Sequence, residues 1–215
     1  MKGLLLKDLA IVKTQRTYAL VVILIAMFML LKGNDVMFVI SYANIIFVML
    51  GINTLHYDAF DNGNSFLFTL PISRKTYVLE KYVFSMCSDF VGVSFSLILL
   101  VVVEFLTEFE VLTSENIASV LGLGCGAMVF LSIVLPIELK FGQEKSRIAM
   151  IVAIFVIVSV VYLVFVGGPV DLSGLAMKLD QMKPLVLVGI GAVIAACLVV
   201  ISFLISCRIV ENKEY

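Results

Sequence analysis

Residues 82–106, YVFSMCSDFVGVSFSLILLVVVEFL, form an apolar run long enough to cross a lipid bilayer as a helix. Similar runs recur on both sides of it, and the whole chain is 62% hydrophobic and only 14% charged. A soluble domain carries about 25% charged residues. In lipid, only helices and closed barrels satisfy every backbone polar group, and runs of this length and apolarity are typical of helices. The composition therefore predicts an all-α integral membrane protein.

Six transmembrane helices can be counted in a single domain that covers residues 1–215. The predicted spans are residues 18–31, 36–55, 82–106, 117–137, 148–166 and 185–209. Residues 1–16, MKGLLLKDLAIVKTQR, are too polar to span, and Leu5, Leu9 and Val12 repeat at a helical spacing. This segment is predicted to be an amphipathic helix in the membrane interface, with a frayed tail as the alternative.

The distribution of lysine and arginine predicts the orientation, because cytoplasmic loops of membrane proteins are enriched in both. With six spans, the termini and the loops after the second and fourth spans share one side. That side carries Lys2, Lys7, Lys13, Arg16, Arg74, Lys75, Lys81, Lys140, Lys145, Arg147, Arg208 and Lys213, and the other carries Lys32, Lys178 and Lys183. We therefore expect a multi-pass protein of the cell membrane with both termini in the cytoplasm.

The sequence offers little catalytic chemistry. Its single histidine, His56, stands at the end of a span beside Asp58 and is expected to form hydrogen bonds rather than to catalyse. The glycine-rich GLGCGA stretch (122–127) lacks the lysine of a phosphate-binding loop and favours close helix packing. The four cysteines lie in apolar runs without a CxxC pair. No catalytic or metal site is predicted, and no basic stripe indicates nucleic acid as a partner.

The cytoplasmic segment 58–81 contains FLFTLPISRKTYVLEK, in which aromatic residues precede a proline and a cluster of charges. Phe60, Phe66, Phe68 and Leu70 are apolar side chains in a loop that would otherwise face water. Pro71 fixes its own φ angle, and Ser73 is placed to cap the helix that runs into the third span. Bases on the cytoplasmic side need no special explanation, whereas the phenylalanines favour docking onto a partner protein.

Two stretches resemble the cytoplasmic loops of small six-helix permeases of ABC exporters, whose ATPase is a separate chain. The first stretch, 57–82, has the family's acid after the second helix, its Leu-Pro-x-Ser-Arg and its Lys-Tyr pair. The second, LPIELKFGQEKSRIAMI (135–151), is similar to the family's other cytoplasmic loop, 138–147, and residues 1–16 are similar to its interfacial elbow helix. The matching residues are Asp58, Leu70, Pro71, Ser73, Arg74, Lys81 and Tyr82 in the first stretch and Pro136, Lys140, Phe141, Gly142, Glu144 and Arg147 in the second.

The resemblance implies that the segment 58–81 contains a cytoplasmic coupling helix that contacts an ABC ATPase. The residues expected to couple to the ATPase are Asp58, Asp61, Phe66, Phe68, Leu70, Pro71, Ser73, Arg74, Lys75, Lys81, Lys140, Phe141, Gly142, Glu144 and Arg147. Two ATPase copies would carry ATP and magnesium, and this chain would bind neither. A second permease chain, identical or related, would complete the translocation path. The resemblance is nearest to bacterial exporters of amphipathic peptides such as phenol-soluble modulins and bacteriocins.

The third span also contains an acid, Asp89, together with Ser85 and Ser88. A charge within a bilayer costs about 2.5–3.5 kcal/mol on insertion scales, so such a residue is expected to face a cavity or another helix. These three residues are candidates to line a translocation path, and a structural contact between helices is the equal alternative. The leading hypothesis is thus the membrane subunit of an ATP-driven exporter of amphipathic or hydrophobic peptides. The alternatives are an ATPase-independent immunity or structural protein and an ion-coupled secondary transporter.

Overall fold

The described part of the chain is entirely helical apart from short connecting residues. The computed structural model describes residues 2–14, 36–60, 71–106, 111–166 and 182–213, with single positions between them at 21, 24, 25, 28, 63, 67 and 69. Its helices are α1 (Lys2–Thr14), α3 (Val36–Ala59), α5 (Arg74–Leu106), α6 (Ser114–Val166) and α8 (Pro184–Glu211). No described residue belongs to a strand, which confirms the all-α prediction for this part of the chain.

Four of these helical segments are long and apolar enough to cross a membrane. They are Val36–Ala59, Arg74–Leu106, Ser114–Gly142 and Pro184–Glu211, and they contain the second, third, fourth and sixth predicted spans. The predicted first span, 18–31, lies outside the described residues except for a few positions. The predicted fifth span, 148–166, is helical as the second part of α6, and its crossing of the membrane stays a prediction.

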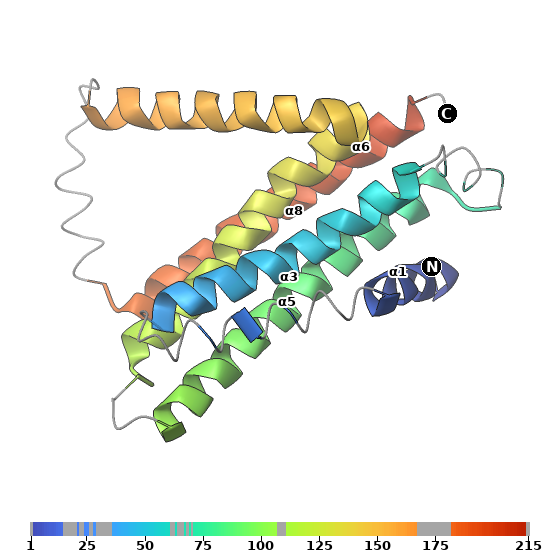
Figure 1. Ribbon diagram of the computed structural model, residues 1–215. Helices are drawn as coiled ribbons and strands as arrows, with labels where there is room; N and C mark the ends of the chain where they lie inside the picture. Colours follow the sequence, from blue (N-terminus) through green and yellow to red (C-terminus); the bar gives the residue numbers. More distant parts are fainter. Residues whose placement is uncertain are drawn as a thin grey trace.

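The four candidate spans run side by side as a bundle (Figure 1). The beginning of α1, the end of α3, the beginning of α5 and the end of α8 all lie at one end of this bundle. α1 packs across this end against α3 and α5. A helix within residues 1–16 is therefore confirmed, whereas its position in a membrane interface stays a prediction.

The packing of α8 is the reverse of that in a water-soluble bundle. Ser202 and Ser206 are buried against the other helices, while Val193 and Leu204 on other faces are 65% and 58% exposed. Tyr82 of α5 forms hydrogen bonds with both serines, at 2.6 Å to Ser202 and 2.8 Å to Ser206. Apolar side chains turned outward and hydroxyl groups turned inward are typical of helices whose surroundings are lipid.

α6 changes direction at Gly142, where the backbone has φ 70° and ψ 175°. This left-handed conformation is readily available only to glycine and breaks the helix at one residue. Figure 1 shows that the part of α6 after this point leaves the direction of the first part. The segment 138–147 was expected to be a loop, but the structure differs, because its residues are helical on both sides of Gly142.

The start of α5 agrees with the sequence. The backbone N–H of Thr76 donates to Ser73 Oγ at 3.2 Å, and the N–H of Tyr77 donates to the Ser73 carbonyl at 3.1 Å. Ser73 is thus the N-cap of α5, as predicted.

Two glycines allow α3 and α5 to approach closely. A methyl group added at Gly92 would lie 2.8 Å from Cβ of Phe47, and one added at Gly51 would lie 2.9 Å from Cα of Ser85. Small residues at such positions bring membrane helices into backbone contact, which increases the dispersion attraction between them. Not every glycine has this role, since nothing lies within 4 Å of a methyl group added at Gly122 of α6.

We expect Gly92→Ala to destabilise the bundle by about 1–3 kcal/mol, because the added methyl group forces α3 and α5 apart. The matched variant is Gly122→Ala, which adds the same group to another membrane helix where there is room. Thermal unfolding of both purified variants in the same detergent checks this, with a lower midpoint expected only for Gly92→Ala. Equal midpoints for the two variants would mean that the α3–α5 contact tolerates the methyl group.

Candidate functional site

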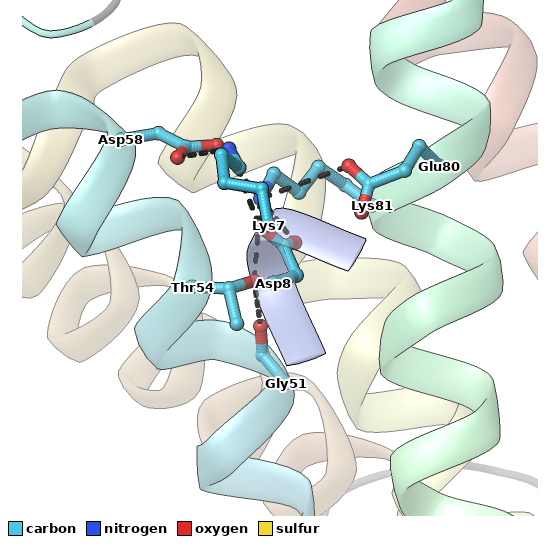
Figure 2. A network of polar contacts seen from close by, with 7 residues as sticks. All are labelled: Lys7, Asp8, Gly51, Thr54, Asp58, Glu80 and Lys81. Atoms are coloured by element: carbon cyan, nitrogen blue, oxygen red, sulfur yellow. Dashed lines mark hydrogen bonds and ion pairs between the residues drawn. The ribbon is translucent and has the colours of Figure 1, made fainter. Parts of the chain in front are cut away.

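Five ionisable side chains meet where α1 crosses the bundle, and we call Lys7, Asp8, Asp58, Glu80 and Lys81 the charge cluster (Figure 2). The Lys81 ammonium lies 2.5 Å from Asp8 Oδ2 and 2.7 Å from Asp58 Oδ2. The Lys7 ammonium contacts Asp58 Oδ1 and lies 3.2 Å from Asp8 Oδ1. The Lys7 ammonium therefore joins α1 directly to the end of α3. The Lys81 ammonium joins all three helices, because it belongs to α5 and contacts Asp8 of α1 and Asp58 of α3.

Four members of the charge cluster are enclosed by protein, whereas the side chain of the fifth, Lys7, is 31% exposed. Asp8, Glu80 and Lys81 are fully buried, and Asp58 is 6% exposed. Removing one partner from a buried ion pair commonly costs about 3–5 kcal/mol, because the other charge is left uncompensated. The cluster therefore holds α1, α3 and α5 in one relative position.

Helical spacing explains how each helix supplies its part of the cluster. Leu4 and Asp8 lie on the buried side of α1, while Leu6 and Leu9 on its other side are 66% and 56% exposed. On α5, Tyr77 stands one turn before Lys81, whose ammonium lies 5.6 Å from the centre of the tyrosine ring. Residues that are four apart share one face of a helix. Asp8 therefore lies on the same face of α1 as Leu4, and Lys81 lies on the same face of α5 as Tyr77, so both charges are directed at the junction between the helices.

Thr54 extends the cluster along α3. Its hydroxyl donates to the Gly51 carbonyl at 2.9 Å and lies 3.4 Å from the Lys81 ammonium, which donates to it. Figure 2 shows this chain of contacts running from Gly51 to Lys81. Lys81 thus contacts α3 through both Asp58 and Thr54, and the backbone of α3 is part of the network.

Asp8 is ionised in this environment. Burial by itself would raise the pKa of its carboxyl, but the adjacent Lys81 ammonium, which also donates a hydrogen bond, lowers the pKa below its ordinary value. The ion pair therefore contributes to stability at neutral pH, and this contribution is lost as the pH falls through the lowered pKa.

Further polar contacts join the remaining helices at the same end of the bundle. Nη1 of Arg74, at the start of α5, donates to the carbonyls of Val210 at 3.0 Å and Glu211 at 2.5 Å. The last carbonyls of a helix have no partner within the helix, so this guanidinium satisfies the end of α8. Lys75 lies 3.3 Å from Glu211 in an exposed ion pair, and Lys213 donates to the Leu139 carbonyl of α6 at 2.9 Å.

His56 completes this set of contacts. Its Nε2 lies 3.1 Å from Glu138 Oε1, which joins α3 to α6. The expectation that His56 takes part in hydrogen bonding is confirmed. Within the part of the chain that the structure describes, no group of three or more His, Cys, Asp or Glu side chains is arranged to hold a metal ion.

A second polar site lies in the middle of the bundle, between α3 and α5. Asp89 and Ser85 of α5 are fully buried, and Asn44 of α3 is 3% exposed. Among the described residues, neither Asp89 carboxyl oxygen, the Ser85 hydroxyl nor the Asn44 amide nitrogen has a hydrogen-bond partner. Ser88, the third residue proposed for a translocation path, is half-buried on the same helix.

A groove of about 770 Å³ adjoins this second site on the side of α6. Asn44 contributes to both, since its amide faces α5 at Gly92 and its side chain also lines the groove. The rest of the groove is mainly apolar and includes Met37, Gly122 and Phe130. Neither Asp89 nor Ser85 lines the groove. Ser85 lies against Gly51 of α3, whereas Asp89 is close enough to Cys125 of α6 to interact with it electrostatically.

The structure brings together only some of the residues predicted to couple to an ATPase. Asp58 and Lys81 pair directly inside the charge cluster, and Arg74 and Lys75 contact the end of α8. Pro71 is exposed beside the Ser73 cap. The positions outside the described residues are Asp61, Phe66, Phe68 and Leu70.

The predicted residues of the second cytoplasmic segment lie around the break in α6. Phe141 is 44% exposed, and the Lys140 ammonium lies 5.2 Å from the centre of its ring. Gly142 is the break itself, Arg147 is exposed on the following helix, and the side chain of Glu144 lies outside the description. These residues are separate from the charge cluster.

Sequence reasoning missed Lys7, Asp8 and Glu80 as members of one site. The sequence does contain a signal for Asp8, since it falls four residues after Leu4 on the face of α1 that should be apolar. An acid at such a position indicates a buried basic partner, and the bases that precede the third span supply the candidates. The missing information was the packing of α1 onto α5.

Comparison with known proteins identifies the family of the chain. Residues 3–211 match the family described as ABC-2 family transporter protein. No curated protein and no solved structure matches the chain. The family match covers nearly the whole length and fits the bundle of apolar helices described above. The chain therefore belongs to the ABC-2 family of transporter proteins and is a membrane-embedded permease of an ABC transporter.

Proposed function

We propose that this chain is the transmembrane subunit of an ATP-driven exporter and that the segment 58–81 couples it to a separate ATPase. The observation that carries the proposal is the ion pair between Asp58 and Lys81, at 2.7 Å. Asp58 lies in the last turn of α3 and Lys81 lies near the start of α5, so this pair joins the two ends of the segment. The pair therefore holds the end of α3 and the start of α5 in one relative position.

The surrounding contacts support transmission of force from the segment to the bundle. A push on the start of α5 reaches α1 through Lys81 and Asp8, and reaches α8 through Arg74. Buried, hydrogen-bonded charges resist rearrangement, because separating them exposes an unpaired charge to an apolar interior. ATP and magnesium would be bound by the partner and not by this chain. A permease therefore needs such stiffness to transmit the partner's movement to its own helices.

The surface that would meet the ATPase is aromatic. Phe60, at the end of α3, is 68% exposed, which supports a docking role for the aromatic residues of this segment. Phe66, Phe68 and Leu70 follow in the sequence, and Arg74 and Lys75 would lie at the rim. Aromatic anchors with a charged rim are typical of protein–protein contacts whose energy is concentrated in a few residues.

The proposed transport complex contains two permease chains and two ATPase subunits in the cell membrane. The second permease, identical or related, would complete a path that one bundle does not enclose. An amphipathic or hydrophobic peptide is the proposed substrate. The mainly apolar groove between α3 and α6, with Ser41, Asn44 and Ser119 as its polar members, suits such a molecule. Both termini, with the charge cluster, would face the cytoplasm.

We expect Phe66→Ala combined with Phe68→Ala to abolish coupling while the permease still inserts and folds. Truncating a buried interface aromatic commonly costs on the order of 2 kcal/mol, which is roughly a thirtyfold loss of affinity. Co-purification of the ATPase with tagged permease, followed by peptide transport and substrate-stimulated ATP hydrolysis in vesicles, measures this. The control is Lys75→Ala, which removes only an exposed ion pair with Glu211 and should be mild. Full transport by the double variant would mean that the segment is only a connector.

We expect Lys81→Met to detach α1 and to reduce coupling. The substitution leaves the Asp8 and Asp58 carboxylates buried without their shared ammonium, a loss of about 3–5 kcal/mol. Hydrogen exchange of residues 2–14 should become faster, and substrate-stimulated ATP hydrolysis should fall. The control is Lys13→Met, which removes an exposed lysine of α1. Unchanged exchange in Lys81→Met would show that the apolar contacts of α1 are sufficient to hold it.

The proposed orientation predicts the accessibility of single cysteines in a background without the four native ones. Cysteines at Lys75 and Lys145, both exposed in the structure, should be shielded from an impermeant thiol reagent applied to intact cells. A cysteine at Leu175, which lies outside the described residues, should react. Permeabilised cells provide the control, because all three positions should then be labelled. Labelling of the Lys75 position in intact cells would reverse the topology.

A further inference from the structure

The charge cluster contains an unequal number of acids and bases. Asp8, Asp58 and Glu80 supply three carboxyl groups, whereas Lys7 and Lys81 supply two ammonium groups. If all five were ionised, the buried junction would carry an excess negative charge. Such a charge in an apolar interior is costly, and a protein commonly avoids it by keeping one acid protonated.

Glu80 is the acid with the weakest pairing. Its side chain is fully buried, and its nearest ammonium, that of Lys81, is 3.7 Å away. Both of its carboxyl oxygens lack a hydrogen-bond partner among the described residues. Asp8 and Asp58, by contrast, each lie within 2.7 Å of the Lys81 ammonium.

The position of Glu80 beside Asp8 offers a solution. Both carboxyl groups adjoin the same Lys81 ammonium, Asp8 at 2.5 Å and Glu80 at 3.7 Å, and Figure 2 shows them on neighbouring sides of it. Two carboxylates can only accept hydrogen bonds, so an ionised Glu80 receives no donor from Asp8, and both of its oxygens are left without a hydrogen-bond partner. One proton on Glu80 supplies the missing donor and removes the excess charge.

We propose that the charge cluster is a proton-binding site in which Glu80 holds one proton, donates it in a hydrogen bond to Asp8, and releases α1 when the proton is lost. The groups that face Glu80 are Lys7 and Asp8 of α1 together with its neighbour Lys81 on α5. Asp58 of α3 acts through the same Lys81 ammonium. The released proton passes to water and leaves a net negative junction, in which Asp8 and Glu80 repel one another.

This site makes the attachment of α1 dependent on pH. In an unfolded chain a glutamate loses its proton near pH 4.3, roughly, whereas the folded cluster retains it at neutral pH. The folded state then binds one more proton than the unfolded state, so the free energy of unfolding falls as the pH rises. The equilibrium constant of unfolding increases by up to about tenfold per pH unit. Asp8 has the opposite dependence, because its pKa is lowered and its contribution to stability is lost as the pH falls. The loss at Asp8 therefore occurs at acidic pH, and the loss at Glu80 occurs as the pH rises.

Infrared spectroscopy of the full-length protein in lipid nanodiscs tests the proposal directly. A carboxylic acid C=O band that shifts upon carboxyl-¹³C labelling of glutamate should be present at neutral pH and should disappear in Glu80→Gln. Labelling only glutamate excludes any band from Asp89. The matched variant is Glu138→Gln, which changes another buried glutamate, the partner of His56, and should keep the band. Absence of a glutamate band in the wild-type protein overturns the proposal, even if Glu80→Gln fails to fold.

Hydrogen exchange tests the release of α1. In the wild-type protein, the protection of residues 2–14 should decrease as the pH rises above neutral, after correction for the intrinsic pH dependence of exchange. Glu80→Gln keeps a neutral hydrogen-bond donor at this place, so its protection should stay constant over the same range. If Glu80→Gln instead loosens α1 as much as Lys81→Met does, Glu80 is an ionised partner of Lys81 and the proposal is wrong.

Discussion

The buried ammonium of Lys81, held between Asp8 and Asp58, is the interaction on which the rest of this end of the bundle depends. It places α1 against α5 and joins the end of α3 to the start of α5. Apolar contacts by themselves are non-directional, so they would allow α1 to slide or rotate across the bundle. The ion pairs fix the position and orientation of α1.

The middle of the bundle is held by a different kind of contact. There Gly51 and Gly92 allow α3 and α5 to touch, and hydroxyl groups such as those of Ser202 and Ser206 join α5 to α8. Asp89 stands apart, because no charge from a described side chain compensates it. α5 therefore has a rigid charged junction at its start and an uncompensated acid near its middle. This difference fits a helix that receives force at one end.

Much of the fold could be predicted from the sequence, because apolar runs and caps are local signals. Residues 36–55, 82–106, 117–137 and 185–209 all fall within long helices, and Ser73 caps α5 as expected. The break in α6 was only partly predictable, because a glycine can end a helix without opening a loop. The charge cluster could not be predicted, since Asp8 and Lys81 are far apart in the chain and nothing local brings them together. Only the packing of α1 across the bundle shows that these charges share one place.

The presence of five ionisable groups in a buried junction needs a reason beyond stability. Replacing a buried ion pair with apolar side chains is often neutral or even stabilising. A cluster of this kind is more useful for fixing one geometry, because Lys81 meets Asp8, Asp58 and Thr54 together only when α1, α3 and α5 are in register. The unequal number of acids and bases then makes that geometry conditional, since it is complete only while a proton compensates the third carboxyl group. A junction built in this way can be rigid during the transmission of force and can still be released without unfolding any of its helices.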